Sequence, residues 1–127
     1  MILIDTSVWI EAERKRVQAL ARLGELVESG EAAVSVVTVF ELLRSPSLPP
    51  VWRAFYTELF SVLPVLDVDR SAAEGAAIAW GARSTDASKD AADALIVGTA
   101  ATAGCALVTC DAAQAAMAPG SELLRPS

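Results

Sequence analysis

Four acidic side chains stand at the ends of apolar runs or early in predicted helices, in segments far apart in the sequence. They are Asp5, Glu41, Asp93 and Asp111. If these carboxylates cluster, each raises the pKa of its neighbours, and a divalent cation is needed to keep several of them ionised. Oxygen ligands without histidine or cysteine favour Mg²⁺ or Mn²⁺ over zinc. Such an ion activates water and neutralises charge on a phosphodiester, and this is the chemistry that the four acids predict.

Each acid also has an ordinary structural explanation. Asp5 fits a turn or helix cap, Glu41 a solvated helix face, and Asp111 a cap before the AAQAAM helix. Asp90 stands three residues before Asp93 on the same predicted helix and is expected to be a cap or a surface residue, although it could face the same crevice. Three further acids are expected in caps and turns: Asp67, Asp69 and Asp86.

The composition excludes several other mechanisms. The 127 residues include no histidine, which rules out Ser-His and Cys-His nucleophile systems and any metal site that needs histidine. The two cysteines, Cys105 and Cys110, have the spacing of neither a CxxC motif nor a disulfide scaffold, so we expect both to be reduced and packed. The net charge of -6 argues against binding nucleic acid by bulk phosphate attraction alone.

Apolar runs typical of buried strands alternate with helical patterns along the chain. Strands are expected at 2–4, 33–37, 64–68, 106–110 and near the ELLR segment at 122–125. Between them, Thr38 is expected to cap the helix that carries Glu41, and apolar side chains at spacings of three and four predict a helix over 51–63. A long helix is expected to begin at Ser88. This alternation predicts one α/β domain over residues 1–127, with a mostly parallel sheet. The carboxyl ends of its strands would share one edge, where the four acids would meet.

The uncharged stretch 94–110 is nearly long enough to cross a bilayer. Aspartates at both ends, the lack of a Lys or Arg anchor and Gly104 before the strand-like ALVT predict instead a buried helix, a stop and a buried strand. The N-terminus lacks the cationic region of a signal peptide. We therefore expect a cytoplasmic protein with no membrane partner.

Four segments, in this order and at these intervals, resemble those of PIN-domain ribonucleases, specifically the VapC-type toxins of bacterial toxin–antitoxin pairs: IDTSVWIE, TVFELLRS, DAADALIVGTA and LVTCDA. The resemblance covers nearly the whole chain. It implies a PIN-like three-layer sandwich with a mostly parallel central sheet flanked by helices, and a Mg²⁺-dependent endoribonuclease in which Mn²⁺ could substitute. It also implies a VapB-like antitoxin partner and a homodimer. The family's acidic tetrad falls on Asp5, Glu41, Asp93 and Asp111, and the hydroxyls of Ser7 and Thr109 match polar positions that support the metal shell.

The last motif departs from the family pattern. After TxD it usually continues into an Asp-Phe pair, whereas this chain reads TCDAAQAAM. The departure weakens Asp111 as a direct ligand and leaves Asp5, Glu41 and Asp93 as the metal ligands. It also gives weight to an alternative function, a catalytically inactive PIN-like interaction module whose acidic pocket binds a partner arginine.

Two other classes fit poorly. A phosphotransfer receiver needs paired acids after its first strand and a lysine after a late strand, and the only lysines, Lys15 and Lys89, are not so placed. A phosphatase with an aspartyl nucleophile would have a DxD motif, but Ser7 stands at the second acidic position.

Basic side chains near the acids are candidates for RNA phosphate contacts. Arg44 lies one turn beyond Glu41, and Arg14 belongs to the ERKR run at 13–16, which is expected on the first helix. That run is equally consistent with a solvated face. The aromatic helix at 51–63 could receive an antitoxin helix, although core packing explains most of its side chains equally well.

Overall fold

The computed structural model describes residues 1–83 and 87–125, with side chains for all of these except 82, 83 and 87–90. Its strands are β1 (Ile2–Ile4), β2 (Ala32–Ser35), β3 (Val65–Leu66), β4 (Ala106–Thr109) and β5 (Glu122–Leu123). Its helices are α1 (Thr6–Glu13), α2 (Val17–Ser29), α3 (Val36–Leu43), α4 (Pro50–Leu59), α5 (Arg70–Arg83), α6 (Ala87–Ala103) and α7 (Ala112–Met117).

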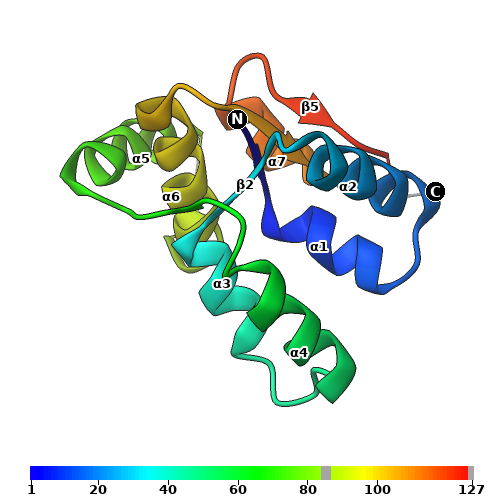
Figure 1. Cartoon of the computed structure of the whole chain (residues 1–127). Helices are drawn as coiled ribbons and strands as arrows, with labels where there is room; N and C mark the ends of the chain where they lie inside the picture. The colour runs from blue at the N-terminus through cyan, green and yellow to red at the C-terminus, as the bar shows by residue number, and fades with distance from the viewer. Residues whose placement is uncertain (84–86, 126–127) are drawn as a thin grey trace.

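The strands form one sheet in the order β3-β2-β1-β4-β5, and all four pairings are parallel. Leu3 in the central strand β1 pairs with Ala33 of β2 on one side and Leu107 of β4 on the other. Helices α1 and α2 lie on one side of the strands and α5 and α6 on the other (Figure 1). The predicted α/β sandwich around a parallel sheet is confirmed.

Alternation along the strands divides the core into two clusters, because successive side chains of a strand point to opposite faces of the sheet. Ile4 packs in one cluster with Trp9 of α1 and Tyr56 of α4. Its neighbour Leu3 packs in the other cluster with Ile96 of α6. All of these side chains are buried. Both faces of β1 are therefore covered, which explains why its sequence is apolar at every position.

The boundary between β2 and α3 differs from the prediction. The hydroxyl of Ser35 accepts a hydrogen bond from the backbone N–H of Val37 at 3.1 Å, so Ser35 caps α3. Val36 and Val37 therefore belong to the helix and not to the strand expected over 33–37, and Thr38 lies inside the helix. The prediction that Thr38 is the cap was wrong, because a serine three residues earlier has the extended backbone that a cap requires.

The ERKR run also lies elsewhere than predicted. Helix α1 ends at Glu13, Lys15 adopts a positive φ of 60°, and α2 begins at Val17. A left-handed residue ends a helix, so Arg14 lies in the turn between α1 and α2 and not on the first helix. Other bounds are shorter than expected: the helix over 51–63 is Pro50–Leu59, and the strand over 64–68 is Val65–Leu66.

The uncharged stretch folds as predicted. Helix α6 ends at Ala103, Gly104 has a φ of 69°, and β4 follows from Ala106. In the described part of the chain, no helix has the length and hydrophobicity needed to span a membrane. Both cysteines are unpaired, Cys105 beside the glycine and Cys110 after β4.

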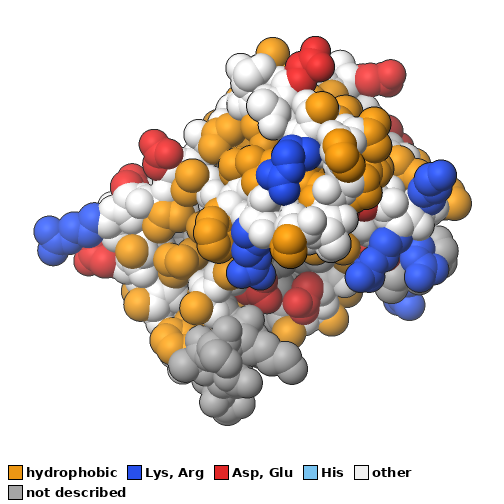
Figure 2. All heavy atoms as spheres, turned by 90° about the horizontal axis from the view of Figure 1, so that it is seen from below, with side chains coloured by type: hydrophobic (Ala, Val, Ile, Leu, Met, Phe, Trp, Pro, Cys, Tyr) orange, Lys and Arg blue, Asp and Glu red, His pale blue; other side chains and the backbone are white. Residues whose placement is uncertain are grey.

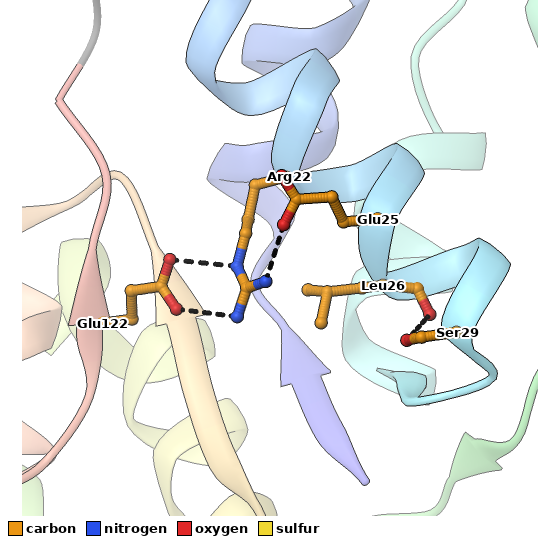
Figure 3. A network of polar contacts seen from close by, with 5 residues as sticks. All are labelled: Arg22, Glu25, Leu26, Ser29 and Glu122. Atoms are coloured by element: carbon orange, nitrogen blue, oxygen red, sulfur yellow. Dashed lines mark hydrogen bonds and ion pairs between the residues drawn. The ribbon is translucent and has the colours of Figure 1, made fainter.

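A charged contact joins the edge strand β5 to helix α2. The guanidinium of Arg22 on α2 donates two hydrogen bonds of 3.0 Å to Glu122 of β5, and a third of 3.0 Å to Glu25 one turn along the helix (Figure 3). The bond to Glu122 is the main cause of the raised pKa of Arg22. This two-pronged geometry attaches the short edge strand β5 to the helix layer.

Helices α5 and α6 pack so closely at Gly98 that no side chain fits there. A Cβ on Gly98 would lie 2.2 Å from the carbonyl oxygen of Ala72 and 2.6 Å from the backbone N of Ala76. Both contacts are to backbone atoms, which cannot move aside as a flexible side chain could. Gly75 faces Gly98 across the same contact, but a Cβ there would lie 3.7 Å from the nearest atom, the Cα of Gly98.

We expect Gly98→Ala to lower the free energy of unfolding by about 1–3 kcal/mol or more, because the overpacking outweighs the preference of about 1 kcal/mol for alanine over glycine in a helix. The matched control Gly75→Ala should leave that free energy unchanged or raise it by up to about 1 kcal/mol. Urea unfolding followed by circular dichroism measures both. Equal stability of the two variants would contradict the close contact of α5 and α6.

Candidate active site

Asp5 lies at the end of the central strand and is only 2% exposed. Its Oδ2 accepts hydrogen bonds from the backbone N–H of Ser7 at 2.9 Å and from the Ser7 hydroxyl at 2.5 Å. Asp5 is thus the N-cap of α1. A buried carboxylate is stable only when donors replace the water that it has lost, and the start of the next helix supplies the first two donors.

Two side chains from the other end of the sequence complete the surroundings of Asp5. The side-chain amide of Gln114 donates to Asp5 Oδ1 at 2.8 Å. The hydroxyl of Thr109 lies 3.2 Å from Asp5 Oδ2 and donates to Gln114 Oε1 at 2.6 Å. The backbone N–H of Cys110 donates to the Ser7 hydroxyl at 2.9 Å. Ser7 and Thr109 therefore both lie beside Asp5, and the network joins β1, β4 and α7.

Glu41 reaches the same edge of the sheet through Thr6. The hydroxyl of Thr6, the residue after Asp5, lies 2.7 Å from Glu41 Oε1 and 2.9 Å from the hydroxyl of Thr38. Glu41 is half-buried, whereas Thr38 is fully buried. The buried hydroxyl pair joins α1 to α3, and the second oxygen of Glu41, Oε2, lies outside this contact.

Asp93 lies in the first half of α6 and is half-buried. Its backbone carbonyl lies 3.4 Å from the Gln114 amide nitrogen, the atom that also donates to Asp5. Asp5, Glu41 and the backbone of Asp93 therefore lie near the carboxyl ends of β1 and β2. The predictions for Asp86 and for the side chain of Asp90 lie outside the described residues.

Asp111 acts as a helix cap. Its Oδ1 accepts hydrogen bonds from the backbone N–H groups of Ala113 at 2.8 Å and Gln114 at 3.2 Å, which makes it the N-cap of α7. Asp69 caps α5 in a similar way, accepting from Ala72 N at 2.8 Å. These contacts agree with the ordinary structural explanation of both residues. The cap also sets the direction of α7, and with it the position of Gln114.

The donor set fits a hard divalent cation in its chemistry. It consists of carboxylate oxygens, which are the ligands that Mg²⁺ and Mn²⁺ prefer. A carboxylate offers about four lone-pair directions, and the hydrogen bond from Gln114 occupies only one of those on Oδ1 of Asp5. Among the side chains that the structure describes, however, no three acids or cysteines are close enough together to form a preformed metal cage. The carboxylate of Asp5 is fixed by its donors, and Glu41 contacts the next residue, Thr6.

Cys110 adds no charge to the site. Burial raises the pKa of its thiol to about 11, helped by the negative charges of Glu11 and Asp5, although a hydrogen bond from Ser7 acts in the opposite direction. The thiol is therefore protonated at neutral pH and does not compete for a cation as a thiolate would.

A pocket of about 230 Å³ opens beside Glu41. Glu13 and Arg14 also line it, and the hydroxyl of Tyr56 donates a short hydrogen bond to Glu13. Burial and this contact with Glu13 raise the pKa of Tyr56 above its ordinary value. Arg14 forms an ion pair with Glu11 at 3.2 Å. The exposed Arg44, after α3, lies with its guanidinium 5.5 Å from the centre of the Phe40 ring.

Sequence reasoning missed Gln114. The side chain is fully buried and contacts Asp5, yet glutamine is an ordinary helix residue and AAQAAM has no charged group. The one available signal was the departure of TCDAAQAAM from the expected Asp-Phe pair.

Solved structures share this fold. A chain of a toxin–antitoxin complex from Klebsiella pneumoniae is 20% identical, with a TM-score of 0.72 and coverage of 100% of this chain and 98% of that one. A chain of DNA-bound VapBC from Salmonella typhimurium is 24% identical, with a TM-score of 0.70 and full coverage of both chains. A chain of FitAcB from Neisseria gonorrhoeae is 23% identical, with a TM-score of 0.72 and coverage of 98% and 97%.

No curated protein sequence shows significant similarity to this chain. The PIN domain family model, by contrast, matches residues 2–119, which include the four strands β1 to β4 and every acid of the site. The parallel sheet and the acids at its carboxyl edge agree with that match. The chain belongs to the PIN domain family.

Proposed function

We propose that the protein is a VapC-type toxin, a Mg²⁺-dependent endoribonuclease that a cognate antitoxin neutralises. The observation that carries the proposal is the buried carboxylate of Asp5, which four hydrogen-bond donors or hydroxyls surround at the end of the central strand. Nearby, Glu41 contacts the hydroxyl of Thr6, the residue after Asp5, and the backbone carbonyl of Asp93 contacts the Gln114 amide. Membership of the PIN domain family supports a nuclease, and the fold shared with toxin–antitoxin structures supports a toxin.

In this proposal, Asp5, Glu41 and Asp93 would hold Mg²⁺ or Mn²⁺. When bound, such an ion lowers the pKa of a water molecule and neutralises charge on the phosphodiester. Ser7 and Thr109 hold the Asp5 carboxylate in place, and Asp111 supports the site by capping α7. We assign to Glu41, which Thr6 contacts at only one oxygen, the acceptance of the proton from the attacking water.

RNA would reach this acidic protein through local cations. Arg44 is exposed after the last turn of the helix that carries Glu41, and Arg14 lines the pocket beside Glu41. We assign both to contacts with RNA phosphates, with Arg44 the stronger candidate because Arg14 already pairs with Glu11. The backbone turn at Lys15 leaves Arg14 at the end of α1, close to the same pocket.

An antitoxin would bind the apolar surface of α3 and α4. Five large apolar side chains are exposed on and beside these helices: Val36, Phe40, Val51, Phe55 and Val62. The face seen from below, where α3 and α4 lie in Figure 1, carries hydrophobic side chains between charged ones (Figure 2). Such a surface suits the apolar side of an amphipathic helix. The proposal includes a homodimer, for which the exposed Ile78 of α5 is a candidate contact.

The alternative is a catalytically inactive PIN-like module whose acidic pocket binds an arginine of its partner. Two observations favour it. No three of the described acids are close enough together to hold a metal ion, and an amide, that of Gln114, contacts Asp5. Metal binding and cleavage separate the two proposals, because the inactive module requires neither.

Asp5→Asn should reduce cleavage by at least about 100-fold, beyond the 10- to 100-fold typical of an outer-shell partner of a metal ligand, because a charged ligand is lost. Purified, antitoxin-free protein would be tested on a panel of tRNA and structured RNA with Mg²⁺, Mn²⁺ or EDTA.

The matched control is Asp111→Asn, in which the amide oxygen still caps α7, so activity should stay within several-fold of the original. Undiminished activity of Asp5→Asn would contradict the nuclease site. If the unaltered protein binds its antitoxin but neither binds Mn²⁺ nor cleaves any RNA of the panel, the inactive module is favoured.

Arg44→Ala should raise KM for RNA while changing kcat little, because a phosphate contact contributes to binding before the reaction begins. The slope of log KM against log salt should fall by about one. Arg44→Lys keeps the charge and should keep that slope. A slope that Arg44→Ala leaves unchanged would remove Arg44 from the RNA contacts.

Phe55→Ser should weaken binding of the cognate antitoxin by at least about tenfold, as expected for a buried aromatic anchor at an interface. The ring centroids of Trp52 and Phe55 lie 5.6 Å apart, so the fluorescence of Trp52 should report the binding. Val17→Ser, at an exposed position on α2, is the control and should have no effect. Equal affinities of the two variants would place the antitoxin elsewhere.

A further inference from the structure

The buried amide of Gln114 makes contacts that core packing does not require. Its nitrogen lies 2.8 Å from Asp5 Oδ1 and 3.4 Å from the backbone carbonyl of Asp93, and its oxygen accepts from the hydroxyl of Thr109 at 2.6 Å. The side chain has no exposed surface. One side chain therefore links the ends of β1 and β4 with α6, in the middle of the candidate active site.

The orientation of this amide is fixed by its neighbours. The backbone N–H of Asp111 donates to the Thr109 hydroxyl oxygen at 3.0 Å, so the hydroxyl proton is free to point to Gln114 Oε1, its nearest acceptor. A flipped amide would place Oε1 2.8 Å from the carboxylate of Asp5 and leave two acceptors in repulsive contact. The NH₂ group therefore faces Asp5.

We propose that Gln114 is a positioning residue that orients the Asp5 carboxylate toward the cation and sets the affinity for it. This inference rests on the proposed function. The amide holds Asp5 Oδ1 by one hydrogen bond and leaves its other lone pair for the ion. The amide is also neutral. Position 114 therefore adds no negative charge to the site, although its side chain lies within 3 Å of Asp5, a metal ligand in the proposed function.

Two substitutions separate these effects. Gln114→Met keeps a similar volume but removes the donor, so Asp5 is less well oriented. Gln114→Glu keeps the acceptor for Thr109 but places a second carboxylate beside Asp5, where the repulsion is relieved by a cation. Gln18→Met is the matched control, because Gln18 is the only other glutamine and is exposed on α2.

The first measurement is the Mn²⁺ dissociation constant of the antitoxin-free full chain, from the electron paramagnetic resonance signal of free Mn²⁺. We expect Gln114→Met to raise it by about 10- to 100-fold, as for other outer-shell partners of a metal ligand. Gln114→Glu should lower it, because an added carboxylate increases the ligand charge. Gln18→Met should leave it unchanged. Folded Gln114 variants that keep the original constant, or that shift it in the same direction, would overturn the proposal.

A second measurement does not depend on metal. The sequence contains two glutamines and no asparagine, so the ¹H–¹⁵N spectrum has two side-chain NH₂ pairs. The Gln114 pair should exchange slowly with solvent and shift in Asp5→Ala, while the Gln18 pair should not. Thr109→Val, which is isosteric, should shift the same pair and replaces Asp5→Ala if that variant does not fold.

The two measurements distinguish failure of the inference from failure of the proposed function. If the unaltered protein binds no Mn²⁺, the metal site of the proposed function fails, and with it the role of Gln114 in setting affinity. Suppose instead that the unaltered protein binds Mn²⁺ and Asp5→Asn does not, but neither Asp5→Ala nor Thr109→Val shifts the NMR signals of the Gln114 NH₂ pair. The proposed function then stands, and Gln114 is not its positioning residue.

Discussion

The structure depends on keeping one carboxylate buried at the end of its central strand. Removing an ionised carboxylate from water costs several kcal/mol unless hydrogen bonds replace the lost hydration. Asp5 obtains its donors from three places: the first turn of α1, the end of β4 and the middle of α7. Thr109 and Gln114 are more than 100 residues from Asp5 in the sequence, so a stable Asp5 requires that the sheet and both flanking helices be in place.

At three strand ends, a residue at or just after the end of the strand caps the helix that follows, but the surroundings of the three caps differ. Asp5 after β1, Ser35 at the end of β2 and Asp111 after β4 each cap the helix that follows. A strand followed directly by a capped helix places the cap at the carboxyl edge of a parallel sheet, where ligands bind in open α/β folds. Of the two acidic caps among these three, only Asp5 is buried and contacts side chains from other elements. Position in the sheet, and not residue type, therefore separates the central acid from the structural one.

The electrostatic character of the site follows from which groups around Asp5 are charged. The nearest donors are neutral: two hydroxyls, an amide and one backbone N–H group. Cys110 stays protonated because burial and nearby acids raise its pKa. Ion pairs of the described chain involve other residues, such as Arg22 with Glu122 on the far edge of the sheet and Arg14 with Glu11. In the described contacts, no basic side chain lies against Asp5, which is compatible with the proposed metal ion and with the alternative, an arginine of a partner.

The sequence by itself determined the parallel α/β fold, the place of Asp5 at a strand end and the helix, glycine and strand of 94–110, because apolar periodicity and glycine act locally. The tertiary structure decided which of two nearby hydroxyl residues caps α3, where α1 ends, and that Asp111 is a cap. It alone brought Gln114 to Asp5, a contact across 109 positions of sequence. The physical reason is that local preferences fix elements, whereas contacts between distant side chains exist only after the elements have packed and excluded water.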